Sequence, residues 1–174
     1  QGARALNNAM MSALPLLESR ADRLRIVHQT GEADLEKTRE TYSRSRFTES
    51  DVRPFISDMF AEFAKADIVI CRAGATSCAE LAAAGKASIM VPLPTAADDH
   101  QRKNAEAFER AGASKMLLQR DLNGETLANA IVELIESPDA VTAMEQAARK
   151  LAKNDAAEAT VDLIEKLARP ASAA

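Results

Sequence analysis

The chain has 174 residues, of which 22 are Lys or Arg and 26 are Asp or Glu, so its formal net charge is −4. This mild acidity is untypical of nucleic-acid-binding proteins, and we predict no nucleic-acid partner. No apolar run approaches the roughly 20 residues of a membrane span, and we expect no signal peptide in residues 1–8. The length suits one domain with its own core, which we place at residues 1–169, followed by a frayed tail at 170–174.

The two cysteines, Cys71 and Cys78, are too few for a disulfide framework, and their spacing matches no zinc site. We expect them to be reduced, as in a cytoplasmic protein, and to be small core residues. His100 has no further ligands at a suitable spacing, so we expect no metal site.

Strand and helix patterns alternate along most of the chain. Short apolar runs predict strands at residues 24–28, 52–56, 67–71, 87–92 and 115–118. Apolar residues at helical spacing predict a helix at residues 3–17, and start and stop residues predict further helices at 31–43, which is polar, and at 57–64, 77–84 and 99–111. This alternation implies an α/β fold with a parallel sheet flanked by helices. We expect Ser57 to cap the helix that it begins.

Beyond residue 118 the pattern is helical only. We predict a helix at 124–136, a second that begins at Ser137 with Pro138 in its first turn, and a third capped by Asn154 or Asp155. The ligands of parallel sheets bind at the carboxyl ends of the strands. The loops to consider therefore follow the strands, at residues 29–31, 56–58, 72–77 and 93–101.

The loop after the third predicted strand has the strongest functional pattern. Gly74 and Ala75 allow a ligand to approach the backbone, and Thr76 and Ser77 add hydroxyls beside a helix N-terminus, which suits a phosphate. Glu80 lies one turn further on and could accept hydrogen bonds from a ribose diol. The alternative is a purely structural turn in which Ser77 caps the helix and Glu80 completes a capping box.

A second polar stretch begins the helix predicted at 99–111. Gln101 and Asn104 carry amides that both donate and accept hydrogen bonds, as binding of sugar hydroxyls requires. Ordinary capping by Asp98 or Asp99 is the alternative, and without further information it is favoured.

Three other features have structural explanations of equal or greater weight. Arg72 could bind a phosphate or pair with Glu80, and the structural pairing is preferred. His28 ends a strand, where a histidine with structural hydrogen bonds is the commoner case. The glycine in residues 1–4 precedes a helix but means little alone.

Taken together and in order, four segments resemble the C-terminal domain of the MurG family of N-acetylglucosaminyltransferases, which make lipid II for peptidoglycan. They are residues 1–7, 55–59, 71–85, and 91–92 with 100–105. The resemblance extends from Gln1 to about Leu167. It implies the C-terminal half of a GT-B glycosyltransferase, in which two Rossmann-like domains face a cleft and this half holds the donor, UDP-N-acetylglucosamine (UDP-GlcNAc).

The resemblance also implies a set of donor-binding residues, in four groups along the chain. These are Gln1 and Gly2; Phe55, Ile56 and Met59; Arg72, Gly74, Ala75, Thr76, Ser77, Cys78, Ala79 and Glu80; and His100, Gln101 and Asn104.

The resemblance implies that each group of residues contacts a different part of the donor. The backbone of Ile56 would read the uracil, with Phe55 and Met59 beside it, while Glu80 would hold the ribose hydroxyls. The amides and hydroxyls of residues 75–77 would line the diphosphate and the sugar.

At the sugar end, Gln101, helped by His100, would read the hydroxyls that distinguish the sugar. Arg72 and Asn104 would support these groups. The chain departs from the family where some members have glutamine at the position of His100 and valine at that of Cys78. We expect the loop at residues 94–97 to differ in length from the family's.

The implied reaction is a displacement with inversion, in which a hydroxyl of the lipid-linked acceptor, lipid I, attacks the anomeric carbon and UDP leaves. Helix N-termini can stabilise the departing diphosphate without metal or cofactor. The family's general base, acceptor site and membrane-contacting surface lie in its N-terminal domain, which this sequence does not include. We therefore expect no catalytic residue in this chain and no activity from it alone. A full-length enzyme would be cytoplasmic and peripheral on the inner face of the bacterial membrane.

The family's central strand, which precedes its first glycine-rich loop, is likewise not in the sequence. Two alternative functions stay open. One is another GT-B enzyme, either a UDP-sugar 2-epimerase or a transferase with a different acceptor. The other is a nucleotide-sugar-binding module without catalysis.

Overall fold

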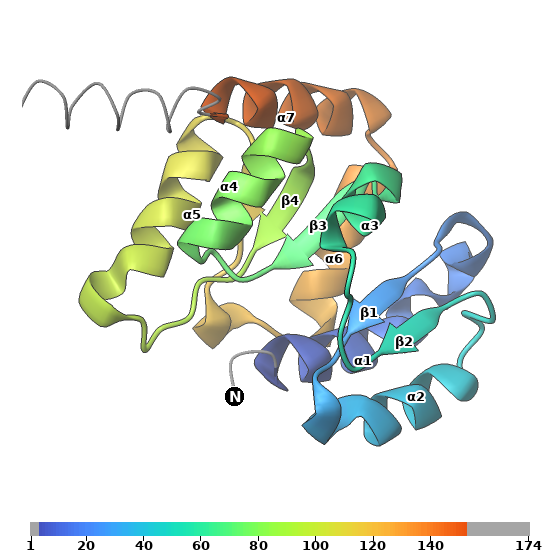
Figure 1. Ribbon diagram of the computed structural model, residues 1–174. Helices are drawn as coiled ribbons and strands as arrows, with labels where there is room; N and C mark the ends of the chain where they lie inside the picture. Colours follow the sequence, from blue (N-terminus) through green and yellow to red (C-terminus); the bar gives the residue numbers. More distant parts are fainter. Residues whose placement is uncertain (1–3, 153–174) are drawn as a thin grey trace, which may run out of the picture.

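The structure is a computed structural model, and it describes residues 4–152. Five short strands alternate with helices and confirm the predicted α/β class (Figure 1). The strands are β1 (Val27–Gln29), β2 (Asp51–Arg53), β3 (Ile68–Cys71), β4 (Ala87–Met90) and β5 (Ser114–Met116). The α-helices are α1 (Arg4–Leu17), α2 (Leu35–Ser43), α3 (Met59–Lys65), α4 (Ala75–Ala84), α5 (His100–Arg110), α6 (Gly124–Ile135) and α7 (Pro138–Leu151).

All strand pairs are parallel, but they form two sheets instead of the single sheet that we predicted. One sheet is β1-β2 and the other is β3-β4-β5. Within the described residues, β1 and β3 are not hydrogen-bonded to each other, which is why the sheet divides there.

Helices cover β4 on both faces, because successive side chains of a strand point to opposite sides. Ile89 belongs to a core formed with α1 and α6, whose members include Leu14 and Leu127. Met90, the next residue, belongs to a second core formed with α4, α5 and α7. Partly buried residues of both sheets pack against the first core, so the two sheets share it.

The close contact between α1 and α6 depends on Gly124. A Cβ atom at this position would lie 2.6 Å from the backbone carbon and oxygen of Ser12. A side chain there would therefore force the two helices apart, so the first glycine of α6 is a packing requirement.

Several boundaries differ from the predicted ones. The second strand ends at Arg53, since Pro54 has no N–H with which to extend the pairing. Asp58, and not Ser57, caps α3, and its side chain accepts a hydrogen bond from the Ala61 N–H. The third C-terminal helix, the tail at 170–174, and Gln1 and Gly2 lie outside the described residues. None of the helices in residues 4–152 is long and apolar enough to cross a membrane.

Candidate functional site

The N-terminus of α4 follows directly from the carboxyl end of β3. Gly74 is the N-cap residue, in an extended conformation, and its carbonyl accepts a hydrogen bond from the Cys78 N–H at 2.9 Å. The backbone N–H groups of Ala75, Thr76 and Ser77 come before this bond and have no partner inside the helix. No side chain caps α4, so these donors lie at the positive end of its dipole, where an anion is favoured.

This arrangement overturns the structural alternative for the same loop. Ser77 is the third residue of α4 and not its cap, so a capping box between Ser77 and Glu80 is not formed. Glu80 is exposed in the second turn, three residues beyond Ser77 and on the same side of the helix. Its neighbour Ala79 is exposed too, whereas Cys78 is buried in the second core.

Both cysteines have the core role that we expected. Burial raises the pKa of the Cys71 thiol to about 12 and raises that of Cys78 as well. Such thiols stay protonated at neutral pH and are poor nucleophiles and metal ligands. Among residues 4–152 there is no group of three or more His, Cys, Asp or Glu that could hold a metal ion.

The start of α5 is shaped by two strained residues. Asp98 and Asp99 have φ angles of 50° and 55°, which side-chain-bearing residues rarely adopt. Neither caps α5 with its side chain, so the capping alternative is wrong. His100 donates from Nδ1 to the Ala97 carbonyl at 2.7 Å, with the tautomer assigned from this acceptor.

Gln101 and Asn104 of α5 form hydrogen bonds with loops at the carboxyl edge of the strands. The Gln101 Oε1 accepts from the Leu93 N–H at 3.0 Å, which leaves its NH₂ group for other contacts. The Asn104 Nδ2 donates to the Ala73 carbonyl at 3.0 Å and so ties α5 to the loop before α4.

Arg72 links the ends of neighbouring strands. Its guanidinium donates to the carbonyls of Val91 and Pro92 at 3.0 and 3.3 Å, and to Gln119 Oε1 at 2.6 Å. Partial burial lowers the pKa of Arg72, since desolvation disfavours its charge. The carboxyl edge is thus held in shape by side chains that the resemblance implicated in donor binding.

The predicted uracil-binding residues follow β2, with Phe55 and Ile56 in the loop and Met59 as the first residue of α3. Phe55 is 71% exposed, while Ile56 is 7% exposed, and Met59 lies between these extremes. The Ile56 N–H donates to Gln29 Oε1 at 2.8 Å. Sequence reasoning missed Gln29 as a residue of the site, and the only signal was its place at the end of a strand, in the loop at 29–31.

His28 has the structural role that we expected. Its two ring nitrogens lie 3.1 Å from the Tyr42 hydroxyl and 3.0 Å from Asn7 Oδ1. Asn7 in turn donates to the Thr30 carbonyl and to Asp34, both at 2.9 Å. Because the amide of Asn7 donates through its nitrogen, its oxygen accepts from His28 Nε2–H, and the Tyr42 hydroxyl donates to Nδ1.

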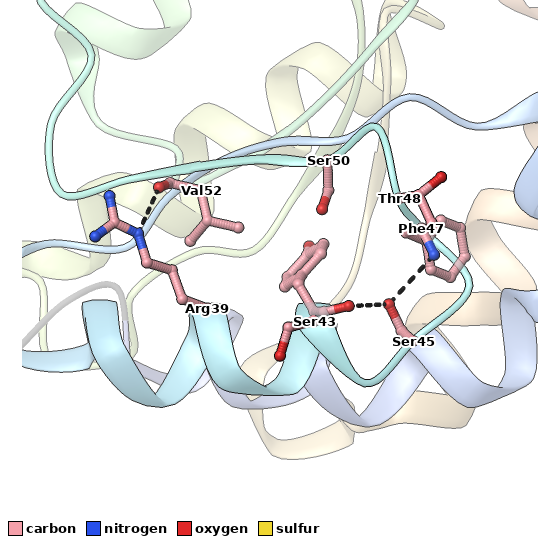
Figure 2. Close-up of a pocket in the computed structure, with 8 residues that line it drawn as sticks. Arg39, Ser43, Ser45, Phe47, Thr48, Ser50 and Val52 are labelled. Atoms are coloured by element: carbon pink, nitrogen blue, oxygen red, sulfur yellow. Dashed lines mark hydrogen bonds between the residues drawn. The ribbon is translucent and has the colours of Figure 1, made fainter.

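A hollow of about 420 Å³ lies elsewhere, against the C-terminal end of α2 (Figure 2). It is lined by Arg39, Tyr42, Ser43, Ser45, Phe47, Thr48, Ser50 and Val52. Figure 2 shows the Arg39 side chain turned to the Val52 carbonyl, to which it donates at 3.2 Å. Residues 44–50 connect the end of α2 to the start of β2. The hollow therefore lies at the amino edge of the strands, opposite the predicted site, and contains none of its residues.

Comparison with known proteins identifies the family. Residues 1–160 match the model of the glycosyltransferase family 28 C-terminal domain. The chain is 51% identical over 158 residues to the UDP-N-acetylglucosamine--N-acetylmuramyl-(pentapeptide) pyrophosphoryl-undecaprenol N-acetylglucosamine transferase of Syntrophotalea carbinolica, covering 91% of this chain and 44% of that one. It is 49% identical over 161 residues to the transferase of the same name from Geotalea uraniireducens, again covering 44% of that protein.

Solved structures agree with this match. The crystal structure of Acinetobacter baumannii MurG has a TM-score of 0.82 at 37% identity, over 95% of this chain and 47% of that chain. The structure of S. aureus MnaA with UDP has a TM-score of 0.67 at 19% identity, over 94% of this chain and 42% of that one, and shows a shared fold. The fold is therefore that of the C-terminal half of a GT-B glycosyltransferase. This chain, which spans about 44% of the length of the curated relatives above, belongs to glycosyltransferase family 28 and carries its C-terminal domain.

Proposed function

We propose that this chain is the donor-binding part of an inverting transferase that moves GlcNAc from UDP-GlcNAc to lipid I, forming lipid II in peptidoglycan synthesis. The names of its relatives support the reaction, since each describes an N-acetylglucosamine transferase acting between UDP-GlcNAc and an undecaprenol-linked muramyl pentapeptide. The observation that carries the proposal is the uncapped N-terminus of α4, with three free N–H groups and Glu80 one turn away.

The diphosphate and ribose would bind at α4. The N–H groups of Ala75, Thr76 and Ser77 can donate to phosphate oxygens, and the helix dipole favours their negative charge. The exposed carboxylate of Glu80 can accept from both ribose hydroxyls. Gly74 has nothing within 4 Å of a built Cβ, so there is open space beside the backbone for a ligand.

The sugar would lie toward the start of α5. The side-chain oxygen of Gln101 accepts the hydrogen bond from the Leu93 N–H, so its NH₂ group remains available to donate. His100, with Nδ1 bound to Ala97, presents Nε2 as an acceptor. A donor on one residue and an acceptor on the next can each bind a hydroxyl of a sugar ring.

The chemistry is a single displacement. The acceptor hydroxyl forms the new bond to the anomeric carbon as the bond from that carbon to the UDP oxygen breaks, with inversion. UDP leaves with increased negative charge. The N–H groups at the start of α4 are already oriented to stabilise this charge, so the proposal requires no metal or other cofactor. The general base, the lipid I site and the membrane contact are expected in a domain outside this chain.

The experiment that tests the proposed function is calorimetry of UDP and UDP-GlcNAc with the 174-residue chain and with its Glu80→Ala variant. The variant loses a charge-assisted hydrogen bond to the ribose, so its affinity for both ligands is expected to fall about tenfold or more. Glu49→Ala removes an equal charge from an exposed turn at the amino edge and should leave both affinities unchanged. If the wild-type chain shows neither heat nor thermal protection with either ligand, the proposed function is wrong.

A further inference from the structure

The backbone N–H of Ile56 is a buried donor that already has a partner. Ile56 is 7% exposed, and its N–H donates to the side-chain oxygen of Gln29 at 2.8 Å. A buried N–H without an acceptor is costly, so some acceptor is expected at this position in every state of the protein. The resemblance assigns the backbone of Ile56 to the uracil of the proposed donor, so its N–H would donate to an oxygen of the base. In the present structure its acceptor is the carboxamide of Gln29.

The two acceptors are chemically alike. A glutamine side chain presents a carbonyl oxygen next to an N–H donor on one planar group. Uracil presents the same pair at one edge, O4 beside N3–H. One N–H forms one strong hydrogen bond at a time, so O4 and Gln29 Oε1 compete for Ile56.

Gln29 can leave without disturbing the loop that carries Ile56. Its side chain is exposed at the end of β1, where water can solvate the released amide. The backbone of the loop is tied to β1 by other bonds, from the Thr30 N–H to the Arg53 carbonyl and from the Gly31 N–H to the Pro54 carbonyl, both at 3.0 Å. These bonds do not involve the Gln29 side chain, so they persist when it moves.

We propose that the carboxamide of Gln29 is an internal stand-in for uracil, which occupies the base position of the empty protein and is displaced from the Ile56 N–H when a uridine nucleotide binds. This inference rests on the proposed function, since it takes Ile56 as the reader of the base. Gln29 then lowers the affinity for UDP by the strength of its own hydrogen bond, and in return keeps a buried donor satisfied while the site is empty.

The test is calorimetry of UDP with the wild-type chain and with Gln29→Ala. Removing a competing hydrogen bond is expected to tighten UDP binding about three- to tenfold. The matched control is Gln146→Ala, which removes an exposed carboxamide from α7 and should leave the affinity unchanged. CDP is the control ligand, because cytosine carries an amino group where uracil has O4 and cannot accept from Ile56.

The outcomes separate the inference from the proposed function. Unchanged or weaker UDP binding by a folded Gln29→Ala chain overturns the inference, because Gln29 would then position the loop instead of competing with the base. Equal tightening of UDP and CDP overturns it as well. A wild-type chain that binds no UDP contradicts the proposed function itself.

A measurement on the wild-type chain covers the case in which the variant does not fold. In ¹⁵N NMR spectra, the side-chain NH₂ signals of Gln29 are expected to move toward those of the exposed Gln146 when UDP is added. Signals of Gln29 that do not move while UDP binds would overturn the inference.

Discussion

At the scale of single residues, the polar side chains of the carboxyl edge mostly bind other parts of the protein. Asn104 holds the Ala73 carbonyl, Gln101 holds the Leu93 N–H, and Arg72 bridges to Val91 and Pro92. The types and positions of these residues could be read from the sequence, but their partners could not, because each partner is a backbone group in a different loop. If the proposed function holds, only the atoms outside these bonds, such as the NH₂ group of Gln101, are available to bind the substrate.

His28 gives a prediction about pH at the same scale. Burial lowers the pKa of His28 from 6.5 to about 4. Above pH 6.5 the ring is neutral in both the folded and the unfolded protein. As the pH falls from 6.5 toward 4, the unfolded chain takes up a proton that the folded protein excludes, so the free energy of unfolding declines. The loss from this residue is expected to reach about 3 kcal/mol near pH 4.

Denaturant unfolding between pH 7 and pH 4 measures this loss. The chain has two histidines, so a matched pair of variants is available. His28→Gln should flatten the decline, since a glutamine does not titrate. His100→Gln, at an exposed position, should keep it, and equal declines in wild type and His28→Gln would show that His28 is not its source.

At the scale of elements, the helix starts show where sequence patterns mislead. The Ser77 and Glu80 spacing matched a capping box, yet α4 begins two residues earlier, because Gly74 adopts the extended backbone of an N-cap residue. In α3 two adjacent residues are both good caps, and the chain uses Asp58 instead of Ser57. The type and the order of the helices and strands were predictable from the spacing of apolar residues. The residue at which each helix begins was not, because it depends on backbone angles that packing sets.

The start of α4 allows one backbone donor to be removed without changing the helix. Ala75 is its first residue, a position that proline tolerates, and Gly74 before it is extended, with φ −66° and ψ 154°, as a residue before proline must be. Ala75→Pro is expected to fold with unchanged stability and to bind UDP about tenfold more weakly, because one N–H to the diphosphate is lost.

Uridine is the control ligand for Ala75→Pro, because it lacks the diphosphate and its affinity should not change. Calorimetry of both ligands and thermal unfolding of the variant make the comparison. Undiminished UDP binding by the folded variant would mean that the diphosphate does not use the first amide of α4.

At the scale of the whole molecule, the strands were predictable from the sequence, but their division into two sheets was not. The apolar run at 67–71 correctly indicated a parallel strand, β3, although its residues are only partly buried, and the parallel order of the strands followed from the alternation with helices. That β1 and β3 are not paired could not be predicted from either strand alone, since pairing depends on what lies between them. A core shared by both sheets holds them in one body, with Ile89 of β4 beside Leu14 and Leu127.

The last prediction concerns this body as a unit: the 174-residue chain binds the donor but transfers no sugar. The free amides of α4 lie within the chain, whereas the resemblance assigns the general base and the acceptor site to another domain. A positioned base contributes about 10²- to 10⁴-fold to the rate, and positioning of the acceptor contributes more. With labelled UDP-GlcNAc and lipid I, the purified chain should therefore give no product while the full-length transferase of Syntrophotalea carbinolica serves as positive control. Product formed by the chain alone would place the base among its own residues.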